Sequence, residues 1–340
     1  MTTPDTNPYS HIDQLKSRVI IPTVADIICS EIPPTSQELC LLEVGPGDGS
    51  STDLLLQLVK ERGLGVKHIR FVETNSGMYR ELSLYWAKGY FGETGIEIME
   101  PLLSVLGDDL PMYENSFNVA NIQMVLHQMS NPDLRSLLFA RILMALENRG
   151  IAVITELHPS YLDYLLKEET GKFKLNETGS AGIYYSSSGV GQDVEILTLQ
   201  DLVVMGLETG FKLKKVKNHD LTPAVDVKTR YQQLKENDIP MVYSMVFEKE
   251  EDRFLSYSEG CVTQCKRRGS FIDITFEDCS TRAVPFNSDL PLQVGDVAVI
   301  LQVKDPGNLN AVITNLWTYT TGQENLTKRF MSVARIINEA

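Results

Sequence analysis

Apolar residues follow two patterns along most of the chain, short continuous runs and longer stretches with helical spacing. The short runs are typical of buried parallel strands, and they occupy residues 40–45, 67–74, 117–125, 151–158, 211–219 and 240–249. The helical stretches fall between them, at residues 52–63, 77–88, 132–150 and 198–210. One further strand lies either at 96–100 or at 102–107, and the pattern does not separate the two.

This alternation of strands and helices predicts an α/β fold. We expect a Rossmann-like, doubly wound, mostly parallel sheet of seven strands with helices on both faces. The last two strands could form a hairpin-like pair at one edge of that sheet. Residues 8–32 have the spacing of a helix that is interrupted near Pro22, and we expect this N-terminal segment to act as a lid over the site.

The pattern changes after Glu250. Residues 271–276, 297–303 and 311–321 are strand-like with turn signals between them, and residues 324–338 have helical spacing. We therefore divide the chain into an N-terminal helical segment (1–35), an α/β domain (36–249) and a small β-rich C-terminal domain (250–340) that ends in a helix. One role for this last domain is a homodimer interface, because its strands and Trp317 offer apolar surface.

Composition restricts the partners and the compartment. The chain has 340 residues, of which 43% are hydrophobic, and it carries a formal net charge of −14. A strongly acidic protein is a poor match for nucleic acid or for an anionic membrane, so we expect a small-molecule substrate. No apolar stretch approaches the roughly 20 residues of a membrane helix, and the first residues lack the features of a signal peptide. We therefore expect a cytoplasmic protein.

The five cysteines predict neither a disulfide framework nor a metal centre. Their number is odd and their positions are scattered, at residues 29, 40, 261, 265 and 279. Cys261 and Cys265 are close in sequence, but zinc needs further ligands and no histidine follows them. We expect free thiols and no bound metal.

The segment EVGPGDG, residues 43–49, lies between the first strand and the first helix of the α/β domain. A glycine turn in that position presents backbone N–H groups to a ligand at close range. A phosphate-binding P-loop needs a lysine after the turn, and Gly49 is followed by serine instead. A dinucleotide site places its third glycine one position later than Gly49, and Glu43 would repel a pyrophosphate. The turn therefore suits a ligand with a positive group and no phosphate.

Glu73, at the end of the second strand, adds a second constraint. A carboxylate in this place commonly accepts hydrogen bonds from ribose hydroxyls. The two observations together predict a ligand that carries a ribose and a cationic part, and S-adenosylmethionine fits that description.

Several segments together resemble class I S-adenosylmethionine-dependent methyltransferases of the small-molecule, natural-product type. LLEVGPGDGSST resembles their first motif, FVETN their second, and LPMYENSFNVANIQMVLHQM their fourth-strand region. ALENRGIAVITE and LTLQDLVVMGLETGFKLKKV are similar to the segments that follow, so the resemblance covers about residues 9–249. Two positions depart from the family pattern. Asn118 replaces the usual aspartate, and the usual adenine-contacting acid falls at Leu106, which leaves Asp108 as the candidate.

The resemblance implies roles for individual residues. The glycine turn would hold the methionine part and the ribose, and Glu43 would stand near the amino group or the sulfonium. Tyr9 would close over the cofactor, Thr74 would pack on the adenine, and Gln123 would face the methionine part. The implied cofactor-binding set is Tyr9, Glu43, Gly45, Pro46, Gly47, Gly49, Glu73, Thr74, Asp108 and Gln123.

The catalytic candidates lie at strand ends. In an open α/β sheet the carboxyl ends of the strands face the ligand crevice, where we place His127, Glu156 and His158. A hydroxyl acceptor needs a base of this kind, and an amine must lose its proton before it attacks. His127 could equally be a packing residue, and His158 a loop-forming residue before Pro159. The tyrosines at 161, 164, 184 and 185 could line a pocket or form the core of a lid.

We expect methyl transfer from S-adenosylmethionine to the nitrogen or oxygen of a small molecule, such as a secondary metabolite, an amino acid or a modified peptide. Two alternatives stay open at this point. One is a protein or RNA methyltransferase that uses the C-terminal domain to hold its substrate. The other is a non-catalytic scaffold with the cofactor-binding fold.

Overall fold

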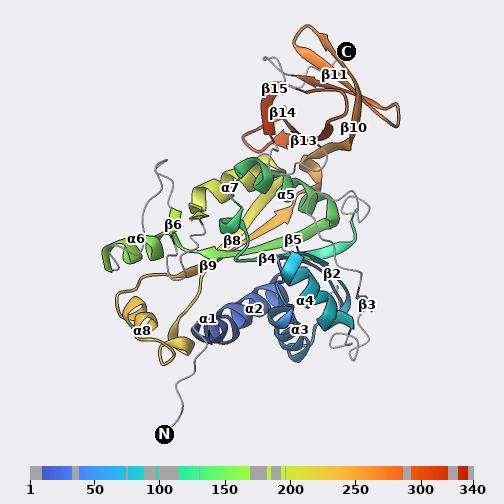
Figure 1. The fold of residues 1–340 in the computed structure, drawn as a ribbon. Coiled ribbons are helices and arrows are strands. Elements are labelled where there is room, and N and C mark those ends of the chain that lie inside the picture. The colour runs from blue at the N-terminus through green and yellow to red at the C-terminus, as the bar shows by residue number, and fades with distance from the viewer. Residues whose placement is uncertain are drawn as a thin grey trace.

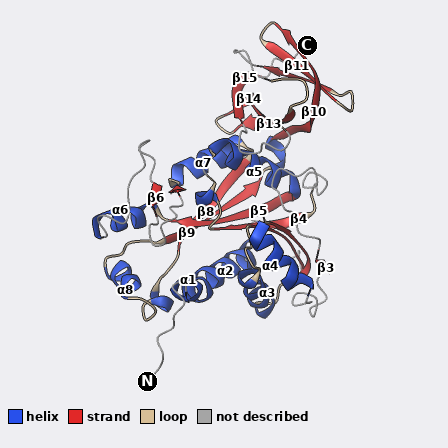
Figure 2. Cartoon of the chain, in the orientation of Figure 1, coloured by secondary structure: helices blue, strands red, loops and turns tan. Residues whose placement is uncertain are grey.

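The computed structural model describes residues 10–32, 38–73, 76–87, 97–98, 115–129, 131–168, 182–184, 193–195, 197–285, 292–320 and 328–335. Figure 1 shows an α/β unit at the N-terminal end and a strand-rich unit at the C-terminal end. In Figure 2 helices flank one broad sheet in the first unit, whereas the second unit is drawn almost entirely as strands. The predicted α/β fold with a separate β-rich part is confirmed.

The main sheet of the α/β unit has its described strands in the order β3-β2-β1-β4-β5-β9-β8, and β6 (Gly182–Tyr184) and β7 (Asp193–Glu195) form a separate two-stranded sheet. Neighbouring strands from β3 to β5 run parallel, whereas β9 is antiparallel to both β5 and β8. This confirms a mostly parallel sheet with an antiparallel pair at one edge, and β3 falls in the first of its two candidate segments. The strands are β1 (Glu38–Val44), β2 (Gly65–Val72), β3 (Glu97–Ile98), β4 (Phe117–Gln123), β5 (Leu146–Leu157), β8 (Phe211–Asn218) and β9 (Val242–Lys249).

Helices cover both faces of this sheet because its central strands are apolar on both sides. Leu39 and Leu41 of β1 belong to one buried cluster, and Leu42 and Val44 belong to another. We call these sides the α2 face and the α5 face, after the helices that pack there, and Figure 1 shows those helices on opposite sides of the sheet. The helices are α2 (Ile21–Glu31), α3 (Ser50–Glu61), α4 (Ser76–Ala87), α5 (Pro132–Ala145), α6 (Pro159–Glu168), α7 (Leu199–Glu208) and α8 (Thr229–Glu236).

The N-terminal segment is helical and is interrupted where the sequence predicts. Helix α1 (Ser10–Leu15) continues into a π-helical turn (Lys16–Ile20), and α2 follows with Pro22 in its first turn. Proline has no N–H to donate to a carbonyl in the preceding turn, which accounts for the irregular turn at this point. Val24 and Ile28 are fully buried in the core of the α2 face. The segment is therefore part of the core, and its role as a lid stays a prediction.

Helix α5 ends earlier than its pattern predicts. The helical spacing extends to residue 150, but α5 stops at Ala145 and β5 begins at Leu146. Leu146 is buried and pairs with Phe117 of β4, whereas the next three residues are exposed and Arg149 has a φ of 63°. Pairing within the sheet thus overrides the local helical preference at this boundary.

The C-terminal unit is an antiparallel sheet in the order β12-β11-β10-β13-β14-β15. Its longest strand, β10, pairs with β11 through one half and with β13 through the other, so it joins the two parts of the sheet. The sequence pattern identifies β11, β13 and β14 but misses β10 and β12. The strands are β10 (Phe254–Arg268), β11 (Phe271–Phe276), β12 (Thr281–Pro285), β13 (Val297–Asp305), β14 (Asn308–Tyr319) and β15 (Lys328–Arg335).

The predicted terminal helix is wrong, because Lys328–Arg335 is strand β15. It pairs antiparallel with β14 along its whole length. Met331 and Val333 are exposed, whereas Phe330 between Arg329 and Met331 is half-buried and packs against the core of this sheet. This period of two suits a strand, and pairing with β14 decides between the two patterns that the residues could follow.

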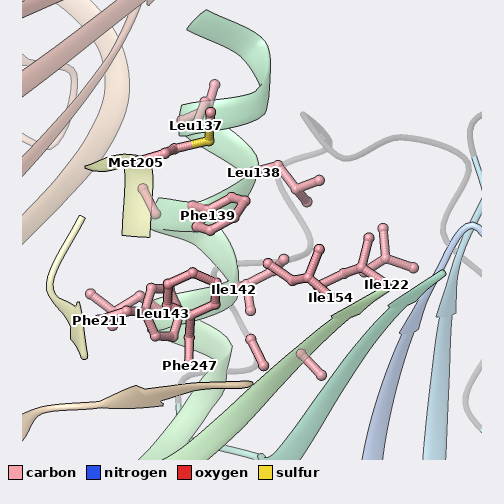
Figure 3. Close-up of a cluster of buried hydrophobic side chains, with 14 of the residues drawn as sticks. Ile122, Leu137, Leu138, Phe139, Ile142, Leu143, Ile154, Met205, Phe211 and Phe247 are labelled. Carbon is pink, nitrogen blue, oxygen red and sulfur yellow. The ribbon is translucent and has the colours of Figure 1, made fainter. Parts of the chain in front are cut away.

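The two units share a hydrophobic core. Val299, Leu301 and Val303 of β13 belong to the same buried cluster as Phe139 of α5. Figure 3 shows Phe139, Ile142 and Leu143 of α5 directed toward the sheet and toward Phe211 and Phe247. The C-terminal unit therefore packs on α5 as an integral part of the protein.

The position of Trp317 contradicts our prediction that this residue offers apolar surface on the C-terminal unit. Its side chain is fully buried, and its Nε1 donates a hydrogen bond of 2.8 Å to Oγ of Ser136 in α5. Nearby, the buried guanidinium of Arg141 pairs with the carboxylate of Glu259 on β10. Trp317 offers no apolar surface to a second copy of the chain, and a homodimer through this unit stays a prediction.

Candidate functional site

The glycine turn lies between β1 and α3, as predicted. Gly45, Gly47 and Gly49 have φ values of 69°, 62° and 89°, all in the left-handed region that favours glycine. A Cβ on Gly45 would lie 2.3 Å from Cγ2 of Val125, so the turn packs tightly against the segment after β4. A Cβ on Gly47 would meet no described residue within 4 Å. The turn therefore has one closely packed side and one side that a ligand can approach.

Glu73 is fixed to this turn by a hydrogen bond. The N–H of Gly47 donates to Oε2 of Glu73 at 3.0 Å, and the N–H of Gly45 donates to the carbonyl of Val72 at 2.8 Å. Glu73 follows β2 directly and is 6% exposed. The structure thus brings together the glycine turn and the second predicted acid.

Glu43 is buried on the α2 face beside the turn, with 3% of its surface exposed. It pairs in register with Asn121 of β4, whose Nδ2 donates to both carboxyl oxygens at 2.9 Å. Burial raises the pKa of Glu43 to about 8, although the hydrogen bond from Asn121 acts in the opposite direction. Oδ1 of Asn121 is also buried and has no hydrogen-bond partner among the described residues. The pair thus presents acceptor oxygens that no described cation neutralises.

Gln123 is the last residue of β4 and lies two residues beyond Asn121. Because side chains alternate along a strand, Gln123 shares the α2 face with Asn121. Its side chain is half-buried. It therefore continues the polar side of β4 toward the carboxyl edge of the sheet.

His127 and Glu156 form a buried pair at the ends of β4 and β5. His127 lies in the 3₁₀ turn Leu126–Gln128, and its Nδ1 is 2.7 Å from Oε2 of Glu156. Oε1 of Glu156 accepts hydrogen bonds from the N–H groups of Val125 and Leu126, at 3.0 and 2.7 Å. Glu156 is 2% exposed and His127 is 9% exposed. Glu156 therefore organises the turn and orients the imidazole.

This arrangement determines how the pair could handle a proton. A carboxylate only accepts hydrogen bonds, so Nδ1 of His127 carries the hydrogen in the contact with Glu156. No described residue makes a hydrogen bond to Nε2 of His127, which can then accept a proton. The pair has the geometry of a general base with a positioning carboxylate.

His158 is held in a different role. Its Nδ1 accepts a hydrogen bond of 3.1 Å from the N–H of Ser160 at the start of α6, and its ring packs edge-on against Tyr243. Burial lowers the pKa of this imidazole. These contacts support the loop-forming role among the two alternatives, and a catalytic role stays a prediction.

Two of the four tyrosines join α6 to α8. Nη1 of Arg230 donates to the hydroxyl of Tyr161 at 3.3 Å, and the hydroxyl of Tyr164 donates to Gln233 at 2.9 Å. Tyr161 is also buried in the core of the α2 face. These two residues therefore have packing roles, as the second of the two alternatives predicts.

Some predicted residues lie outside what the structure describes. These are Tyr9, Thr74, Asp108 and Tyr185, together with the side chain of Tyr184. Within the described ranges, no group of three or more metal-ligating side chains gathers, and no helix is long and apolar enough to cross a membrane.

Sequence reasoning missed Asn121 and Thr52. Thr52 is 1% exposed in the first turn of α3, and its buried Oγ1 makes no hydrogen bond to any residue that the structure describes. The available signal for Asn121 was its position, since an amide inside the otherwise apolar run of β4 must find a buried partner. That partner, Glu43, is distant in sequence and is identified only by the pairing of β1 with β4.

Proteins similar to this chain are found among the solved structures. No family model and no curated protein matches the sequence. A methyltransferase dependent on S-adenosylmethionine from Methanosarcina mazei is similar at 15% identity, over 66% of this chain and 97% of that one, with a TM-score of 0.48. Another from Mesorhizobium loti is 17% identical, over 67% of this chain and 100% of that one, with a TM-score of 0.44.

A third similar structure has a different description. It is the [4+2]-cyclase SpnF, at 16% identity over 67% of this chain and 80% of that one, with a TM-score of 0.42. These similarities, with TM-scores of 0.48, 0.44 and 0.42, carry no argument about this chain, and proteins of one fold can differ in function. The solved structures that the chain resembles include several S-adenosylmethionine-dependent methyltransferases, and the functional proposal rests on the residues of the site.

Proposed function

We propose that this chain transfers a methyl group from S-adenosylmethionine to a small-molecule acceptor. The observation that carries the proposal is the buried pair of Glu43 and Asn121 beside an open glycine turn. A carboxyl group that is removed from water without a cationic partner is costly, and a ligand with positive charge offsets that cost. A phosphate ligand brings no positive charge to this carboxyl, which separates this site from a nucleotide phosphate site.

The residues present fit this cofactor. The unpartnered Oδ1 of Asn121 and the carboxyl of Glu43 suit its cationic amino-acid part, and the open side of Gly47 leaves room for its backbone contacts. Glu73, held by the N–H of Gly47, would receive the ribose hydroxyls. Gln123 would face the methionine part. When bound, the cofactor supplies an electrophilic methyl group on a sulfonium.

His127 and Glu156 would together remove the proton from the acceptor. Glu156 holds Nδ1–H of the imidazole, so Nε2 can accept the proton that an acceptor hydroxyl or amine loses when it attacks the methyl group. Glu156 does not touch the acceptor in this scheme and is a positioning residue. His127 would be the catalytic base for an N- or O-methylation.

Two features support a small acceptor. The formal net charge of −14 disfavours nucleic acid. The C-terminal unit uses Trp317 and residues of β13 to pack on α5, so this part of its apolar surface serves the protein's own core. A secondary metabolite, an amino acid or a modified peptide remains the proposed class, and we propose a cytoplasmic setting for it.

Calorimetric titration with S-adenosylmethionine tests the proposal. We expect saturable binding by the wild-type protein and its loss in Glu73→Ala, because the ribose contact disappears. Glu61→Ala is a matched control, since Glu61 is an exposed residue at the end of α3. Folded wild-type protein that shows no binding at about 1 mM cofactor would refute the proposal.

A further inference from the structure

The surroundings of Glu43 contain no described cation. Among the described residues its one side-chain hydrogen-bond partner is the neutral amide of Asn121, and Phe71 is its register partner on β2. The titratable side chains of the adjoining turn and strand tip, Asp48 and Glu73, are both carboxyls. Arg70 of β2 lies next to Phe71 and alternates to the opposite face of the sheet.

The histidine nearest in sequence to Asn121 does not face Glu43 either. His127 makes its hydrogen bond to Glu156, and Glu156 shares the α5 face with Ile154 because the two residues alternate in step along β5. Glu43 is on the α2 face with Leu41. The carboxyl of Glu43 therefore has burial and one amide as its environment, and no basic side chain shares that environment in the described residues.

Such a carboxyl must be neutralised in one of two ways. It holds a proton while no ligand is bound, because an unpaired buried carboxylate is costly. A ligand cation that enters the site provides the second way and removes the need for the proton. Asn121 suits both states, since its Nδ2 stays on the carboxyl while its unpartnered Oδ1 offers a second acceptor to the cation.

We infer that Glu43 and Asn121 form a cation receptor that releases one proton when a positively charged ligand binds. This inference rests on the proposed function, and it adds that uptake of the cofactor is a proton exchange. The bond that breaks is the O–H of the Glu43 carboxyl, and the proton passes to solvent. The ligand's positive charge takes its place, so the net charge of the buried site is unchanged.

The exchange has a definite pH dependence. The pKa of Glu43 without ligand is raised to about 8 by burial, and a bound cation lowers that pKa. Affinity for a cation should therefore rise about tenfold per pH unit from about pH 6 to pH 8 and level off above that range. A neutral ligand gains nothing from the ionised carboxyl and should show no such rise.

Calorimetry in buffers with different ionisation enthalpies measures the protons released. The probes are S-adenosylmethionine, which has a sulfonium and an ammonium, S-adenosylhomocysteine, which has only the ammonium, and methylthioadenosine, which has neither. We expect close to one proton released with S-adenosylmethionine at pH 7 and none with methylthioadenosine. If S-adenosylhomocysteine also releases a proton, the ammonium is the recognised group. If it binds without releasing a proton, the sulfonium is the recognised group.

Variants assign the proton to this residue. Glu43→Gln keeps the size and the hydrogen-bonding capacity of the side chain, and it should lose the proton release that is specific to the charged ligands. Glu38→Gln, on an exposed residue of the same strand, should behave as wild type. Equal proton release in wild type and Glu43→Gln would overturn the inference while leaving the proposed function intact.

A second measurement needs neither a ligand nor a variant. A ¹³C-labelled Glu43 carboxyl in the wild-type protein should titrate near pH 8 by NMR. Titration near its ordinary value of 4.5 would overturn the inference. Failure of all three ligands to bind would refute the proposed function itself, and that outcome is distinct from binding without proton release.

Discussion

Replacing Glu156 with glutamine removes the negative charge of the side chain but keeps most of its hydrogen bonds. The side chain is nearly isosteric, and its Oε1 can still accept from the N–H groups of Val125 and Leu126, so two of the three contacts survive. The third changes, because the new amide would present an N–H group to Nδ1 of His127 in place of a carboxylate. His127 must then carry its hydrogen on Nε2.

The expected losses of stability and of methyl transfer follow from this single changed contact. Losing one buried charge-assisted hydrogen bond while keeping a neutral one should cost about 1–2 kcal/mol of unfolding free energy. The wrong tautomer leaves Nε2 unable to accept a proton, so methyl transfer should fall about 100- to 10,000-fold at unchanged cofactor affinity. A merely structural role would lower stability without changing the tautomer.

The assay combines ¹⁵N NMR of the His127 ring with urea unfolding. We expect the Nδ1–H form in the wild type, the Nε2–H form in Glu156→Gln, and a loss of stability in the stated range. Gln128→Glu, on an exposed neighbour of His127 in the same turn, controls for a change of one charge near the ring and should keep the Nδ1–H form. An Nδ1–H tautomer that persists in Glu156→Gln would refute the assignment of Glu156 as the positioning residue.

Three further predictions concern packing and pH. Trp317→Phe should lose about 1–3 kcal/mol of unfolding free energy, because it removes a buried hydrogen bond and packing volume, and urea denaturation that shows no change would contradict the shared core. Gly45→Ala should lose more than about 2 kcal/mol, whereas Gly269→Ala, with a similar φ but open space, should lose about 1 kcal/mol, and equal losses would disprove tight packing at Val125. Because the pKa of Glu43 is raised from 4.5 to about 8 on folding, the folded state keeps a proton that the unfolded state releases in this window. The unfolding free energy of wild type relative to Glu43→Gln should therefore fall by about 1.4 kcal/mol per pH unit as pH rises between about 5 and 8, and parallel pH profiles in urea titrations would exclude a buried, protonated carboxyl.

The sequence predicts those features that depend on local pattern. Apolar runs and helical spacing locate the strands and most helices of the α/β unit, since the central strands are buried on both faces and a helix such as α3 buries one face. Gly45 and Glu73 are predictable because a strand end followed by a glycine turn is a local signal. The turn and the acid then meet because neighbouring parallel strands bring their carboxyl ends to one edge.

Features that depend on distant pairing were not predictable in the same way. Residues 328–335 fit a helix or a strand by themselves, and only β14 decides the outcome. Trp317 looks like exposed surface until α5 is placed against it. Asn121 and Glu43, and likewise His127 and Glu156, are partners across strands that are separated by whole helices.

A crystal structure with S-adenosylhomocysteine tests the central claim most directly. The proposed site predicts the ligand along the open side of the Gly45–Gly49 turn, with its ribose hydroxyls on Glu73 and its amino-acid part toward Glu43 and Asn121. Density for the ligand at any other place, or a ligand whose ribose does not contact Glu73, would contradict the account.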